Sequence, residues 1–138
     1  MKSDAHETFS WPTRVYYEDT DAGGVVYYAN YLKFLERART EWLRARGFEQ
    51  SALVRERGVV FVVHDVHIRY LRPAVFDDSL LVTVSVHATG RSWIEFVQTV
   101  ERGNEILTRA QVKIVCVNQL SFKPVEIPEI IRDNMEIR

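Results

Sequence analysis

The chain has 138 residues, which fits one domain with a hydrophobic core of its own. Its 18 Lys and Arg residues against 19 Asp and Glu residues give a formal net charge of -1, which argues against a dedicated nucleic-acid-binding protein. The only cysteine, Cys116, excludes an intramolecular disulfide and a site built from several thiolates. We therefore expect one domain over residues 1–138.

Hydropathy along the chain argues against a membrane segment. The longest clean apolar run, 59–63, is far shorter than the ~20 residues that span a bilayer. The first residues, MKSDAHETFSWP, lack the apolar stretch of a secretory signal. We expect a cytoplasmic protein without a transmembrane segment.

The first half of the chain predicts a strand, a loop and one long helix. Residues 13–17, TRVYY, indicate a short strand, and the acidic, glycine-bearing loop EDTDAGG follows it. Tyr31, Leu35, Ala38 and Trp42 then recur at helical spacing, which predicts a helix over about 28–46. Residues 50–57 are expected to add one or two helical turns.

From Val59 onward the apolar period becomes two, which predicts four strands. Glycine-bearing separators at 89–91 and 102–104 predict hairpins, so the strands that they join should be antiparallel neighbours. A short helix is expected after Pro128. One helix can cover only one face of such a sheet. Because four apolar side chains fall out of phase with the buried face, we expect a partner subunit to cover them: Trp93, Val97, Val115 and Val117.

The densest polar cluster is the loop that joins the first strand to the long helix. It holds Glu18, Asp19 and Asp21, followed by Gly23 and Gly24. The start of a helix carries a partial positive charge and unpaired N–H groups, which can receive an oxyanion. A carboxylate beside it can attack an activated carbonyl, or deprotonate a water that attacks. Glycines allow the backbone to approach a ligand closely.

Each candidate also has a structural interpretation. Asp19 or Asp21 can simply cap the helix, and the local pattern alone favours capping. His64 and His67 resemble part of a metal site, but residues three apart on a strand point to opposite faces, so we expect no metal ion. Cys116 lies within a strand pattern without an evident base, which is typical of a buried structural thiol.

Two motifs resemble the acyl-CoA thioesterases associated with the Tol-Pal system, a branch of the 4-hydroxybenzoyl-CoA thioesterase family. They are the stretch D-T-D-A-G-G-V-V-Y at 19–27 and the segment E-R-A-R-T-E at 36–41. Further similarity lies at Phe61-Val-Val, at Pro73 with Asp77-Asp78, at Val115-Cys-Val and at Lys123-Pro124, so the resemblance covers nearly the whole chain.

The resemblance implies an α+β hotdog fold, in which a five-stranded antiparallel sheet wraps a long helix. It implies hydrolysis of acyl-CoA between two subunits, without a cofactor, in a homotetramer that is a dimer of dimers. The catalytic carboxylate of the family falls on Asp21, and the N–H that polarises the thioester carbonyl falls near Tyr28. By the same resemblance, we expect four residues to contact the substrate: Gly23, Gly24, Val25 and Phe61.

Tyr28 departs from the branch, which commonly has histidine there as an assistant to the aspartate. A phenol is protonated at neutral pH, so Tyr28 cannot act as a base, although it can donate a hydrogen bond or line the acyl pocket. An alternative function is a non-catalytic module that binds acyl-CoA or acyl carrier protein and is linked to the Tol-Pal system. A hotdog dehydratase is disfavoured because no histidine has a matching context.

Overall fold

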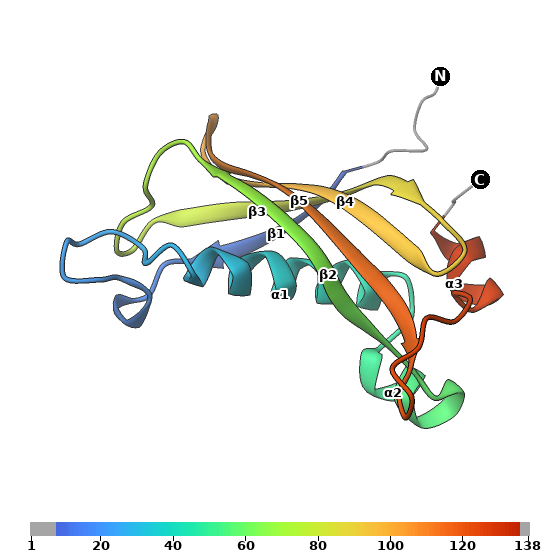
Figure 1. Cartoon of the computed structure of the whole chain (residues 1–138). Helices are drawn as coiled ribbons and strands as arrows, with labels where there is room; N and C mark the ends of the chain where they lie inside the picture. The colour runs from blue at the N-terminus through green and yellow to red at the C-terminus, as the bar shows by residue number, and fades with distance from the viewer. Residues whose placement is uncertain (1–7, 136–138) are drawn as a thin grey trace, which may run out of the picture.

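In the computed structural model, residues 8–135 are described, and they form one helix-wrapping sheet with two short helices at its edge (Figure 1). A single 3-10 turn, Tyr17–Asp19, follows the first strand. The strands are β1 (Phe9–Arg14), β2 (Val59–Tyr70), β3 (Ser79–Thr89), β4 (Trp93–Arg102) and β5 (Glu105–Asn118). The helices are α1 (Asn30–Ala45), α2 (Gln50–Arg57) and α3 (Glu129–Asn134).

The five strands form one antiparallel sheet in the order β1-β3-β4-β5-β2, and α1 lies along one face of it (Figure 1). This confirms the α+β hotdog fold expected from the sequence. Both predicted hairpins are present, since β3 pairs with β4 and β4 pairs with β5. The apolar side of α1 packs on the inner side of the strands, where Leu35, Phe34, Val84 and Phe96 are almost completely buried.

The first strand begins and ends earlier than the sequence predicted. We expected it at 13–17, but β1 covers Phe9–Arg14 and pairs with β3. Pro12 is tolerated there because β1 is at the edge of the sheet, where one side of the backbone needs no partner. Val15 leaves the strand ladder, because its N–H donates to Asp78 O and its carbonyl accepts from Asp77 N–H.

The long helix starts at Asn30 rather than at 28, and the two residues before it form a turn. Asn30 N–H donates to Tyr27 O at 2.8 Å, and Leu32 N–H donates to Ala29 O. These backbone hydrogen bonds join residues three apart, as in a 3-10 turn, and they precede the regular helix. Tyr28 therefore lies two residues before the helix, not in its first turn. The predicted helices at 50–57 and after Pro128 are present as α2 and α3.

The expected partner-covered side chains are not the ones that the fold leaves open. Val115 and Val117 are buried within the chain, and Trp93 and Val97 are partly buried. The reason is that the chain after β5 turns back beside that strand. Val125 N–H donates to Cys116 O, and Ile127 N–H donates to Arg91 O. The expectation was wrong for Val115 and Val117, because the chain covers them itself.

The open apolar surface lies on the other edge strand, β2. A register shift beside His64 puts Val63 and Val66 on the same, helix-facing side of the sheet as Tyr70. They are 50%, 37% and 45% exposed, whereas the helix-facing Val82, Val84 and Phe96 of the central strands are 0% exposed. One helix thus covers the middle of the sheet and leaves the inner side of β2 uncovered.

Cys116 is completely buried within the core, and burial raises the pKa of its thiol to about 11. Because the thiolate is the reactive form, we expect the folded protein to resist Ellman's reagent at pH 8, while the unfolded chain reacts at one thiol. The unfolded thiol loses its proton first as pH rises from about 9, so this residue also lowers folding stability between pH 9 and 11. Rapid labelling of the folded protein would contradict this burial.

Candidate active site

The acidic loop folds into a tight turn that begins at Asp21. Asp21 N–H donates to Val25 O at 2.9 Å, and Gly24 N–H donates to Asp21 O at 3.0 Å. The Asp21 carboxylate oxygen Oδ1 accepts from Gly23 N–H at 2.8 Å. Gly24 has φ of +82°, a conformation that side chains other than glycine's rarely adopt. The two glycines therefore allow the turn that presents Asp21.

Neither acidic side chain caps the long helix, so the capping interpretation is wrong. The residue before α1 is Ala29, and no side chain caps that end. Asp19 instead accepts from Tyr16 N–H through Oδ2 at 2.8 Å, which holds the 3-10 turn. Asp21 is exposed, and within the described residues its carboxylate makes only the bond to Gly23. One carboxylate oxygen, Oδ2, has no hydrogen-bond donor there.

The main chain of Asp19 ties this loop to the start of α1. Asp19 O accepts from Tyr27 N–H at 3.0 Å and from the side-chain amide of Asn30 at 2.9 Å. The negative charge of Asp21 also acts on Tyr27, next to the start of α1. Tyr28 is the main cause of the raised pKa of the neighbouring Tyr27 phenol, and the carboxylate of Asp21 adds a smaller effect. The loop and the helix start therefore form one unit.

At this helix start, the N–H groups of Tyr28 and Ala29 have no acceptor among the described residues. The N–H groups on either side are used, since Val26 donates to Ala74 O and Asn30 donates to Tyr27 O. Tyr70 fixes the local backbone, because its hydroxyl donates to Tyr28 O at 3.0 Å. Unpaired N–H groups held in place beside a carboxylate are the elements of an oxyanion site.

Aromatic side chains surround a shallow hollow next to Tyr28. The hollow has an empty volume of about 500 Å³ and is lined by Tyr28, Tyr31 and Tyr70 together with Val26 and residues 71–73. Tyr31 hydroxyl accepts from Ala74 N–H at 3.0 Å, which anchors it. Burial raises the pKa of Tyr70, and the neighbouring Tyr31 and Tyr28 add to the effect, so the Tyr70 phenol stays protonated at neutral pH. Sequence reasoning missed Tyr31 and Tyr70, because neither lies in the loop motif.

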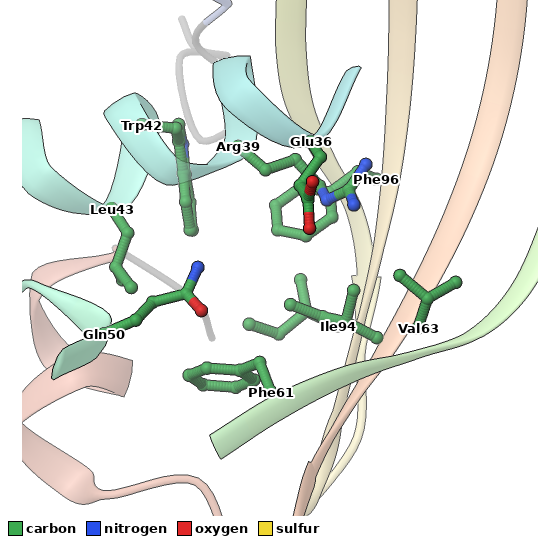
Figure 2. A pocket seen from close by; sticks show the side chains of 10 residues that line it. Glu36, Arg39, Trp42, Leu43, Gln50, Phe61, Val63, Ile94 and Phe96 are labelled. Carbon is green, nitrogen blue, oxygen red and sulfur yellow. The ribbon is translucent and has the colours of Figure 1, made fainter. Parts of the chain in front are cut away.

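The other expected substrate contacts lie in two different places. Val25 is partly buried and is bridged to Val75, beside the loop. Phe61 is on β2 and lines a second hollow near the far half of α1, together with Trp42 and Phe96 (Figure 2). Within one chain, the structure thus brings Gly23, Gly24 and Val25 to Asp21 but not Phe61.

The weaker candidates show no sign of chemistry. His64 Nδ1 contacts Asp65 Oδ2 at 3.0 Å on the surface. Among residues 8–135, no group of three or more His, Cys, Asp or Glu side chains is placed to hold a metal ion. In the same residues, no helix is long and apolar enough to cross a membrane.

Comparisons with known proteins identify the family. Residues 15–135 match the family model of the thioesterase-like superfamily. The chain belongs to this superfamily. It is 47% identical over 124 residues to "Acyl-CoA thioesterase YbgC" of Haemophilus influenzae, which covers 90% of this chain and 91% of that protein. The resemblance read from the loop and helix motifs is therefore confirmed, and the chain is a thioester hydrolase.

Solved structures of the superfamily share the fold. A probable thioesterase from Bartonella henselae is 34% identical with a TM-score of 0.83, over 88% of this chain and 99% of that one. A mutant 4-hydroxybenzoyl-CoA thioesterase, complexed with 4-hydroxybenzoyl-CoA, is 20% identical with a TM-score of 0.87, over 93% and 98% of the two chains. At that identity, the second likeness shows the fold alone.

Proposed function

We propose that this thioester hydrolase cleaves acyl-CoA to a free acid and CoA, with Asp21 as the catalytic carboxylate. The observation that supports it best is the combination of one unpaired carboxylate oxygen with unpaired N–H groups at the helix start. A relative that is 47% identical is named an acyl-CoA thioesterase, which supports the same substrate class.

The reaction needs few groups. The N–H of Tyr28, or that of Ala29, donates to the thioester oxygen and stabilises the negative charge that develops there. Asp21 either attacks the carbonyl carbon or takes a proton from the water that attacks it. The carbon–sulfur bond breaks, CoA leaves as a thiolate, and the water oxygen ends in the acid. Because a thiolate is a good leaving group, a strong general acid is not required.

We further propose that the active site lies between two copies of the chain. The support is the uncovered inner side of β2, an edge strand with exposed Val63, Val66 and Tyr70. A second copy paired along β2 would bury these side chains and extend the sheet. Tyr70 also contacts Tyr28, so this surface adjoins the proposed oxyanion site. In this proposal the cytoplasmic enzyme is a homotetramer, a dimer of such dimers.

The test is turnover of a panel of acyl-CoA substrates by the purified protein, measured as release of free thiol. We expect hydrolysis of at least one acyl chain class with a typical enzymatic kcat, on the order of 1 s⁻¹ or more. No turnover of any thioester, combined with measurable binding of acyl-CoA or acyl carrier protein, would instead favour the alternative of a Tol-Pal-linked binding module.

A further inference from the structure

A second hollow lies between the far half of α1, the start of α2 and the inner side of the sheet. In the single chain its cavity volume is about 60 Å³, and the empty space reaches about 500 Å³ when the open mouth is included. Figure 2 shows the side chains around it, and most of them are apolar. The apolar part of the wall consists of Trp42, Leu43, Phe61, Val63, Ile94, Phe96 and Ile114. Such a wall suits the acyl part of a thioester.

One charged side chain is held in this wall by a buried amide. Arg39 Nη1 donates to Gln98 Oε1 at 3.0 Å, and Gln98 is 0% exposed. The Gln98 amide nitrogen donates in turn to Leu35 O at 3.1 Å and to Thr83 O at 3.2 Å. Gln98 is therefore fixed on both sides, and it sets the position of the guanidinium.

Most N–H groups of the Arg39 guanidinium have no acceptor among the described residues. Among the described residues it makes one hydrogen bond, to Gln98, although a guanidinium carries five N–H groups. Burial lowers the pKa of Arg39 to about 10, so it remains charged at neutral pH. A charge placed in an apolar wall is unfavourable unless polar groups compensate it. The remaining donors thus favour a ligand with an oxygen at this point.

Glu36 decides what kind of oxygen fits. It lines the same hollow one turn before Arg39 and its charge acts on the arginine, yet Glu36 is exposed and no ion pair joins the two side chains. In Figure 2 both side chains project from α1 on the side of the hollow. A second carboxylate placed between them would be repelled by Glu36. A hydroxyl accepts from the guanidinium and donates to the carboxylate.

We propose that this hollow binds the acyl end of the substrate and that Arg39, with Glu36, selects aliphatic acyl groups carrying a hydroxyl near their far end. This rests on the proposed function. Arg39 lies nine residues beyond Asn30, about 14 Å along the helix, so a short acyl group cannot reach from Tyr28 to Arg39 of the same chain. Phe61 and Val63 of β2 line the hollow, so in the proposed pairing along β2 the Asp21 loop of a second copy would present the substrate.

The test compares acyl-CoA pairs of equal length, from four to eight carbons, with and without a terminal hydroxyl. We expect the native enzyme to favour the hydroxylated member by about tenfold or more in kcat/KM at one length at least. Arg39→Met should remove this preference, so that kcat/KM for the hydroxylated member falls to that of the unsubstituted member of the same pair. Arg44→Met, an exposed arginine of the same helix that pairs with Glu41, should keep the preference.

A second variant tests the assignment of Glu36. In Glu36→Gln the repulsion is gone, so kcat/KM for succinyl-CoA should rise relative to butyryl-CoA, while the Arg39→Met variant should show no such rise. Equal turnover of both members of every pair by the native enzyme would overturn the inference and leave the proposed function intact. Failure of the proposed function is a different result, namely no turnover of any member. Unfolding temperatures of all variants identify any loss that comes from misfolding.

Discussion

Replacing Asp21 by asparagine should reduce kcat for acyl-CoA hydrolysis by about 10²- to 10⁴-fold, the contribution usual for a positioned acid or base. Asparagine has the same shape and keeps an oxygen that can accept from Gly23 N–H, so the turn should persist. It cannot attack the thioester or accept the proton of water at neutral pH. We therefore expect the loss in kcat, with little change in the KM that reports binding.

The matched control is Asp133→Asn, which makes the same chemical change on an exposed residue of α3, at the other end of the molecule from the Asp21 loop (Figure 1). It should leave kcat unchanged. Thiol release with a range of acyl-CoAs measures both variants, and circular dichroism verifies the fold. If Asp21→Asn hydrolysed the substrates as fast as the native protein, the catalytic carboxylate would have to be sought elsewhere.

The sequence predicted the elements well where a pattern repeats and poorly where geometry depends on distant neighbours. The period of two gave the four later strands, and the glycine separators gave both hairpins. The first strand was misplaced because its end is set by bonds between Val15 and residues 77–78, far away in the chain. Val115 and Val117 were misassigned because the cover comes from the chain after β5.

The candidate site could be located from its motif, but its partners could not. The acidic loop with Gly23 and Gly24 indicated Asp21, and the structure adds that no carboxylate caps the start of α1. Tyr70 reaches Tyr28 only because β2 folds back over the helix start. Arg39 did give a signal, since it lies four residues after Leu35 and three before Trp42, on the buried side. Gln98 shares the period of Ile94 and Phe96.

Introducing a charge on the uncovered side of β2 should convert the enzyme into inactive monomers. In Val66→Glu, a carboxylate would be placed without a partner in the proposed interface between copies, which costs about 3 kcal/mol or more. That corresponds to roughly a 100-fold weaker dimer. Val66 is 37% exposed in the single chain, so the folded monomer itself can place the new carboxylate in water.

The consequence for activity follows from where the proposed site lies. If residues from two copies are needed, hydrolysis should fall together with the dimer fraction, and raising the protein concentration should restore both. Size-exclusion chromatography with light scattering gives the mass, and thiol release at the same concentrations gives the activity. Ile130→Glu is the control, because Ile130 is 45% exposed on α3, which contacts the loop between β3 and β4 rather than β2. A native protein that is fully active as a monomer at micromolar concentration would contradict the proposal that the active site needs two copies of the chain.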